Sequence, residues 1–125
     1  MNVKIELLIE IIESVSEKCF FKATDYMGFL DKKYFNQKFQ DFNYKKYGLL
    51  IIPLNTNNKK ELINYLKKVE VLFFQEIHII CNEKILLESY DGFDAGVTIS
   101  KSIRINIEKY RKEGIDIGFF TPNSE

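Results

Sequence analysis

The sequence contains no tryptophan, only two prolines, two cysteines and one histidine, and no excess of either charge. Its 18 lysine and arginine residues balance 18 aspartate and glutamate residues, so the formal net charge is zero. Non-specific nucleic-acid binding depends on an excess of cationic side chains that displace counterions from phosphates. The balanced charge therefore argues against a direct nucleic-acid partner.

Long uncharged apolar stretches are also absent. The run from Gly48 to Leu54 is far shorter than the roughly 20 residues that a membrane-spanning helix needs. The first residues, from Met1 to Glu6, carry charge where a secretory signal would be apolar. Cys19 and Cys81 lie far apart in apolar surroundings, which is typical of reduced thiols rather than of a disulfide framework. We therefore expect a cytoplasmic protein without a membrane segment.

The single histidine, His78, limits the catalytic chemistry open to the chain. A Ser–His–Asp or Cys–His arrangement would have to use it. Cys81 lies three residues further along the same predicted strand, so its side chain would point to the opposite face. The cysteines and the histidine lack zinc-type spacing, and the glycines form no phosphate-binding motif. We therefore expect no catalytic residue, no metal and no cofactor, and a binding protein rather than an enzyme.

The sequence has the size and composition of one globular domain over residues 1–125. Apolar residues recur at steps of three and four over residues 3–19, which predicts an amphipathic helix. The same spacing of aromatic residues predicts a second helix over 24–46. Asn58 and Glu61 have the spacing of a capping box, which predicts a short helix ending near residue 70.

Five segments have the pattern of strands. They are the apolar run 49–52, the alternating segments 73–81, 85–90 and 97–107, and the terminal segment 115–119. Together these elements predict an α+β fold in which N-terminal helices pack on an antiparallel sheet of four or five strands.

The turn of the hairpin at residues 82–84 is predicted to contain three residues. That register places His78 opposite Glu88 and apolar residues opposite one another. A two-residue turn would place Cys81 opposite Lys84 and mix the two faces of the hairpin. We therefore interpret His78 as a structural residue of the sheet, paired with Glu88.

Two groups of carboxylates stand out against the neutral net charge. One follows a single arc of the first predicted helix, which is also the pattern of a solvated helix face. The other lies on the hairpin and the following loop beside two aromatic residues, which is typical of a surface that binds a basic protein. The candidate partner-binding residues are Glu6, Glu10, Glu13 and Glu17 on the helix, and Glu83, Glu88, Tyr90, Asp91, Phe93 and Asp94 on the hairpin and loop. We favour the hairpin and loop, because the two aromatic rings add apolar burial.

The segment from Glu76 to Ile105 resembles part of the small bacterial immunity proteins of contact-dependent inhibition and other polymorphic-toxin systems. The likeness lies in a hairpin that ends in Leu-Leu-Glu-Ser-Tyr-Asp-Gly-Phe (residues 86–93), followed by a strand containing Ser-Lys-Ser-Ile (residues 100–103). It implies a cytoplasmic, antitoxin-like protein that binds one cognate toxin domain in bacterial competition and blocks it. The chain departs from the acidic character of many such proteins, since its net charge is zero. A small enzyme or ligand-binding α+β domain and a self-associating structural protein are the alternatives.

Overall fold

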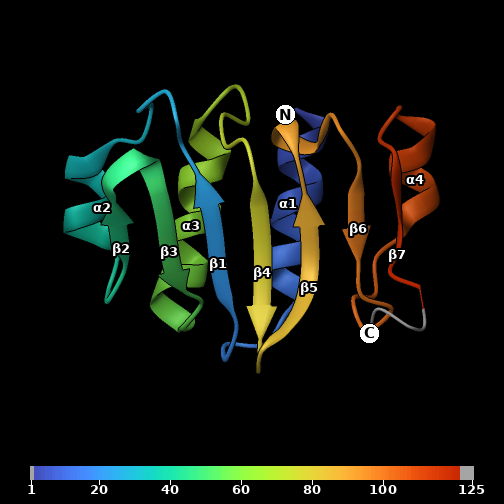
Figure 1. Cartoon of the computed structure of the whole chain (residues 1–125), viewed down its shortest axis with the longest axis horizontal. Coiled ribbons are helices and arrows are strands. Elements are labelled where there is room, and N and C mark those ends of the chain that lie inside the picture. The colour runs from blue at the N-terminus through green and yellow to red at the C-terminus, as the bar shows by residue number, and fades with distance from the viewer. Residues whose placement is uncertain (1, 122–125) are drawn as a thin grey trace.

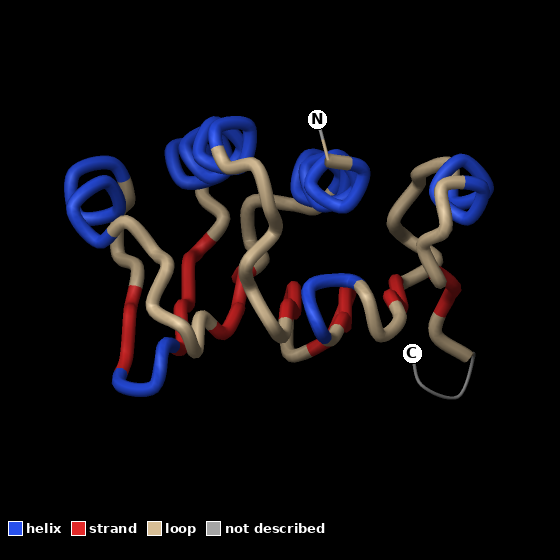
Figure 2. The backbone as a smooth tube through the Cα atoms, turned by 90° about the horizontal axis from the view of Figure 1, so that it is seen from above, coloured by secondary structure: helices blue, strands red, loops and turns tan. Residues whose placement is uncertain are grey.

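The computed structural model describes residues 2–121, which form an α+β structure with helices and strands in two layers. Within these residues, seven strands form a mixed sheet in the order β2-β3-β1-β4-β5-β6-β7 (Figure 1). The strands are β1 (Phe20–Thr24), β2 (Asn43–Lys45), β3 (Leu49–Pro53), β4 (Ile77–Cys81), β5 (Lys84–Ser89), β6 (Val97–Ile99) and β7 (Ile117–Phe119). The four α-helices are α1 (Val3–Ser14), α2 (Lys32–Lys38), α3 (Thr56–Lys68) and α4 (Ile107–Lys112). All four helices lie on the same side of the sheet (Figure 2).

The hydrophobic core lies between the helix layer and the sheet. Alternate strand residues such as Phe21 in β1 and Ile79 in β4 are fully buried, and α1 contributes Ile5, Leu8 and Ile12. The N-cap of this helix is Asn2, whose side chain accepts a hydrogen bond from the N–H of Lys4 at 2.8 Å. It ends at Ser14, five residues before the predicted end, because the backbone is already extended at Val15.

The predicted helix over residues 24–46 is wrong. The chain leaves β1 at Asp25, whose buried carboxylate accepts hydrogen bonds from the N–H groups of Phe29 and Leu30, both at 2.9 Å. These bonds favour a compact loop over a helix. Within this range only the seven residues of α2 form an α-helix. The aromatic side chains that suggested a longer helix pack together instead, and Phe35 stacks on Phe39 with ring centroids 4.2 Å apart.

The sheet has more strands than the four or five predicted, and it is not wholly antiparallel. β4 is the central strand, β1 lies between β3 and β4, and β2 and β7 form the two edges. β6 is only three residues long, because the chain turns at Ser100, whose carbonyl accepts the N–H of Ile103. The chain then passes through α4 and returns as β7 parallel to β6, since parallel neighbours need a crossover connection.

The hairpin of β4 and β5 has the predicted pairing of His78 with Glu88 but not the predicted turn. Asn82 and Glu83 have φ angles of 51° and 66°, as in the two-residue type I′ turn. A β-bulge leaves Leu86 without a partner in the register. This extra residue restores the apolar alternation that a plain two-residue turn would have disrupted.

Candidate binding face

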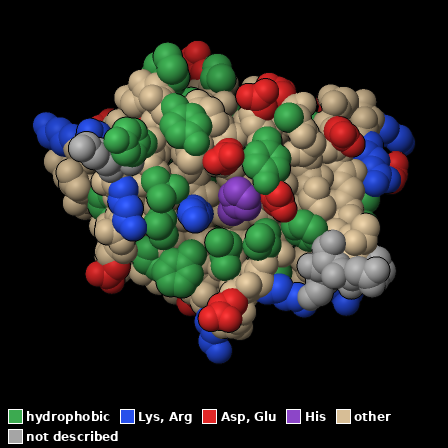
Figure 3. Space-filling view, in the orientation of Figure 1, with side chains coloured by type: hydrophobic (Ala, Val, Ile, Leu, Met, Phe, Trp, Pro, Cys, Tyr) green, Lys and Arg blue, Asp and Glu red, His purple; other side chains and the backbone are tan. Residues whose placement is uncertain are grey.

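The four α-helices leave the other side of the sheet uncovered (Figure 2). The register β3–β1–β4–β5 arranges side chains there in two neighbouring rows. One row is apolar and contains Pro53, Phe20, Ile80 and Ile85. In Figure 3, hydrophobic side chains gather around the purple histidine on this face. Exposed fractions on the face include 48% for Phe20, 42% for Ile85 and 41% for Tyr90, so the face offers an accessible apolar surface.

The second row is polar and crosses the middle of the same face. Lys22 pairs with His78, His78 with Glu88, and Glu88 with Thr98. Glu88 accepts a hydrogen bond from the Tyr90 hydroxyl, and this bond raises the pKa of Tyr90 above its ordinary value. The Tyr90 ring also meets the His78 ring edge to face, with centroids 6.0 Å apart. His78 therefore has Lys22 and Glu88 as its cross-strand neighbours and the Tyr90 ring as a side-chain contact.

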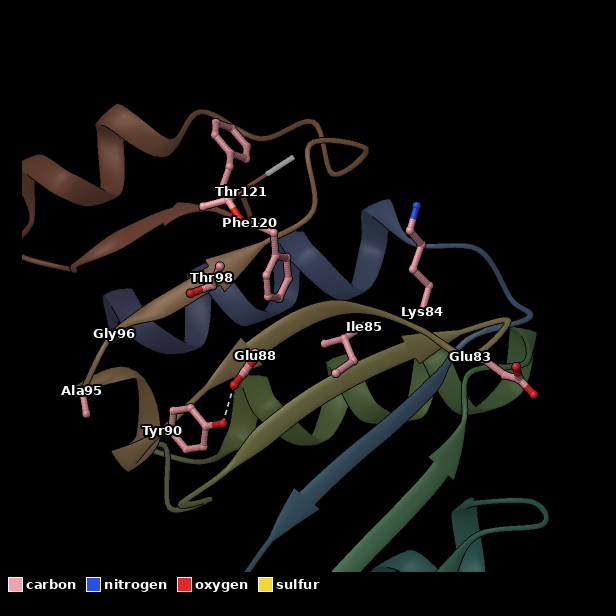
Figure 4. Close-up of a pocket in the computed structure, with 11 residues that line it drawn as sticks. Glu83, Lys84, Ile85, Glu88, Tyr90, Ala95, Gly96, Thr98, Phe120 and Thr121 are labelled. Atoms are coloured by element: carbon pink, nitrogen blue, oxygen red, sulfur yellow. Dashed lines mark hydrogen bonds between the residues drawn. The ribbon is translucent and has the colours of Figure 1, made fainter. Parts of the chain in front are cut away.

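A groove of about 850 Å³ crosses the face beside β5. Figure 4 shows Glu88 and Tyr90 side by side at the groove, with Glu83 and Lys84 near the hairpin turn. The rest of the lining comes from Ile85 of β5, the segment from Ala95 to Thr98, and the end of β7 with the two residues after it. Carboxylates, an aromatic hydroxyl and apolar side chains therefore meet within one depression.

The structure brings together some of the predicted hairpin and loop residues. Glu83, Glu88 and Tyr90 line the groove, and Asp91 is exposed on the short 3₁₀ helix (Asp91–Phe93) that follows β5. Asp94 is also exposed, but it forms a salt bridge with Lys4 of α1.

Phe93 is not available to a partner, so the prediction of an exposed Phe93 ring is wrong. Its side chain is 2% exposed and belongs to the core. The preceding Gly92, at φ 59°, donates its N–H to the carbonyl of Gln75 at 2.9 Å. A β-carbon on Gly92 would lie 3.1 Å from the Phe74 carbonyl oxygen. This close approach holds the loop against the segment that precedes β4, and the ring of Phe93 is buried in the core.

The four glutamates of the predicted helix stripe do not form one free surface. Glu6 forms a salt bridge with Lys109 of α4, and Glu10 accepts a hydrogen bond from Tyr110 of the same helix. Glu13 is exposed near the end of α1. Glu17 lies beyond the helix, so its predicted place on the same arc is wrong. Two of the four carboxylates therefore hold α1 and α4 together.

A second apolar surface was missed in the sequence. Tyr26, Met27 and Phe29 in the loop after β1, together with Tyr47, are between 61% and 81% exposed. The buried carboxylate of Asp25 holds this loop from inside. The pattern Asp-x-x-Gly at residues 25–28, a common turn signal, could have indicated the loop.

Charge is separated along the chain although its sum is zero. Residues 31–68 contain nine lysines and three carboxylates, and they form one end of the sheet and its helices (Figure 1). Residues 69–100 contain six carboxylates and one lysine, and they include β4, β5 and β6. The acidic residues of the second segment are Glu70, Glu76, Glu83, Glu88, Asp91 and Asp94. The groove therefore belongs to the acidic part of the molecule.

Comparison with known proteins found no matching family model, no matching curated protein and no matching solved structure. Among residues 2–121, no group of three or more histidine, cysteine, aspartate or glutamate side chains is placed to hold a metal ion. None of the helices in that range combines the length and the apolar character needed to cross a membrane.

Proposed function

We propose that this chain is an immunity-type inhibitor that binds one cognate toxin domain through the uncovered sheet face and blocks it without catalysis. The observation that supports the proposal is the meeting, on that face, of the exposed apolar row with the acidic groove. Exposed apolar surface next to polar groups is characteristic of protein-binding sites. The resemblance of residues 76–105 to immunity proteins covers the same hairpin.

The chemistry of the groove favours a partner with a basic surface. Glu83, Glu88 and Asp91 would attract cationic side chains over several ångströms and so speed the encounter. Desolvated charge pairs contribute little net affinity, so the apolar groups must supply most of it. Tyr90 and Phe20 are exposed aromatic residues of the face and are the expected anchors.

The test is co-expression with each candidate toxin domain encoded by the genes adjacent to that of this chain, scored by cell growth and by isolation of a complex. We expect growth to be rescued and a stoichiometric complex to form. Ile85→Asp, at an exposed position in the apolar row, should abolish both while leaving the thermal melt close to that of the parent. Glu13→Lys, on the helix side, is the matched control and should rescue growth normally.

Kinetics with the purified toxin domain separate the two roles assigned to the face. Tyr90→Ala should raise the dissociation rate and weaken binding by about 2 kcal/mol. Glu83→Gln combined with Asp91→Asn should mainly slow association and reduce its salt dependence. No rescue and no complex with the parent chain would refute the inhibitor proposal. Loss of binding with Glu13→Lys but not with Ile85→Asp would place the interface on the helices.

A ligand-binding function is the second candidate, and the groove itself is the observation in its favour. Its carboxylates and the Tyr90 ring suit a small organic cation, which acidic and aromatic groups bind together. Thermal melts with polyamines and quaternary ammonium compounds test this. A saturable rise in melting temperature that is lost in Glu88→Gln would favour this candidate over the inhibitor.

A further inference from the structure

The two cysteines, 62 positions apart in the sequence, lie at neighbouring ends of two paired strands. Cys19 directly precedes β1 and Cys81 is the last residue of β4. The antiparallel register of these strands ends with Phe20 opposite Ile80. One step further in each direction places Cys19 opposite Cys81.

The side chains of the two cysteines meet at one serine. The Ser16 hydroxyl oxygen lies 3.8 Å from the sulfur of Cys19 and 3.7 Å from the sulfur of Cys81. The two thiols also interact with each other, and both are free rather than bonded. Cys19 is 1% exposed, whereas Cys81 is partly exposed. The pair therefore has one accessible sulfur and one protected sulfur.

The backbone geometry at this site suits a covalent bond. Directly opposed residues in antiparallel strands have Cα atoms about 4.5 or 5.5 Å apart. Disulfides span Cα separations of about 4.4–6.8 Å. Rotation of the two side chains away from Ser16 would therefore bring the sulfurs together without moving the strands.

We propose that Cys19 and Cys81 are a dithiol site that forms a reversible intramolecular disulfide by exchange with a small disulfide such as oxidised glutathione. The Cys81 thiolate attacks one sulfur of the small disulfide, and the other half leaves as a thiolate that takes up a proton. Cys19 then loses its proton to solvent, its thiolate attacks the Cys81 sulfur, and the second small thiol leaves. Two protein thiols are oxidised, and one small disulfide is reduced to two thiols.

Two features of the site shape this reaction. Burial raises the pKa of Cys19 to about 11, so little of the resolving thiolate exists at neutral pH and closure should be faster at alkaline pH. The bond would join β1 to β4 beside Phe20 and Ile80 of the apolar row. Oxidation would therefore stiffen one end of the candidate binding face, although the site itself does not depend on the proposed function.

The test uses the full chain, incubated with oxidised glutathione at pH 8 and then compared with a sample kept in dithiothreitol. We expect an intact mass lower by two hydrogens, no titratable thiol, and no change in the monomeric state. Because the bond closes a long loop, the melting temperature should rise by about 10 °C and return to its original value with reductant.

Single-cysteine variants provide the control. Cys19→Ala should stop at one glutathione adduct on Cys81, and Cys81→Ala should react far more slowly, because its remaining thiol is buried. Ser16→Ala should still form the bridge, since the hydroxyl contacts the thiols without taking part in exchange. A parent chain that yields only glutathione adducts, only disulfide-linked dimers, or no product would overturn the proposal.

Discussion

Asp25 is the buried charged residue on which the loop after β1 depends. Its carboxylate accepts two backbone N–H groups and the hydroxyl of Tyr44, the last at 3.0 Å. Gly48, at φ 79°, packs against the same residue, and a β-carbon there would lie 2.2 Å from the Asp25 carbonyl oxygen. The conformation of the loop that carries the exposed Tyr26, Met27 and Phe29 side chains therefore depends on the buried contacts of Asp25.

Replacement of Asp25 should be among the most destabilising single changes. We expect Asp25→Ala to lower the free energy of unfolding by about 3 kcal/mol, because the backbone N–H groups of Phe29 and Leu30 lose their acceptor. Tyr44→Phe, which removes only the hydroxyl donor, should lower it by about 1 kcal/mol. Urea titration measures both values. Equal small effects would mean that the loop keeps its shape without the carboxylate.

At the scale of elements, α4 is joined to α1 by polar contacts at two successive positions. Lys109 pairs with Glu6, and the buried Tyr110 donates its hydroxyl proton to Glu10. Burial and the bond to Glu10 raise the pKa of Tyr110. The contact therefore has a defined dependence on pH.

The stability of the protein should fall at alkaline pH, in part through Tyr110. In the unfolded chain a tyrosine ionises near a pKa of about 10, whereas the folded state holds this proton to higher pH. The contribution of Tyr110 is therefore complete below pH 10 and is lost as the pH rises above it, at up to about 1.4 kcal/mol per pH unit. Urea titrations between pH 8 and pH 11 should show a shallower decline for Tyr110→Phe. An unchanged slope would contradict this assignment.

The hairpin turn offers a stabilising change. Glu83 occupies the second position of the turn at φ 66°, a conformation that glycine adopts without strain. Glu83→Gly should raise the free energy of unfolding by about 1 kcal/mol. Lys84→Gly, at the first residue of β5, should lower it by roughly 0.5–1 kcal/mol. A lower free energy of unfolding for Glu83→Gly would show that the positive φ of Glu83 does not cost the folded state stability.

At the scale of the whole molecule, the lysine-rich segment 31–68 and the acidic segment 69–100 make a neutral chain with separated charge. We expect weak head-to-tail attraction near the sequence pI of about 6.6, most evident at low salt. Light scattering should show attraction between molecules at 0.01 M salt, where screening extends over about 30 Å, and little at 0.15 M, where it extends over about 8 Å.

A control variant distinguishes charge from apolar contact. Exchange of the exposed residues Lys60 and Lys67 for glutamine should weaken the low-salt attraction. Association that instead strengthens with salt and disappears in Ile85→Asp would identify the uncovered sheet face as a self-association surface.

The local pattern of apolar and polar residues was sufficient to predict several of the helices and strands. Steps of three and four predicted α1, although with an end five residues too late. The apolar run 49–52 corresponds to β3, and the pairing of His78 with Glu88 was predicted from the match of side chains. The spacing of Asn58 and Glu61 predicts a capping box, but Asn55 caps α3, and Asn58 is buried with its amide donating to the carbonyls of Gln40 and Pro53. The partners that distinguish these roles lie outside the helix.

Local pattern failed for β1 and β2. β1 has only five residues and directly precedes aromatic residues at helix-like spacing, so nothing nearby marks it as an interior strand of the sheet. Its conformation depends on β3 and β4, which pair with it on both sides. Phe93 was expected at the surface for a similar reason, because its burial depends on the contact of Gly92 with the chain at Phe74 and Gln75.

The sequence by itself determined the neutral net charge, the α+β class and the buried faces of α1 and β4. These properties follow from composition and from the period of apolar residues, which act within a few positions along the chain. Only the tertiary structure decided which face of the sheet stays uncovered. It also decided that Lys109 and Tyr110 of α4 bind Glu6 and Glu10 of α1, and that Cys19 and Cys81 lie together at Ser16. Each of these depends on strand order and register between distant segments, and such pairings are set by the packing of the whole core rather than by any local period.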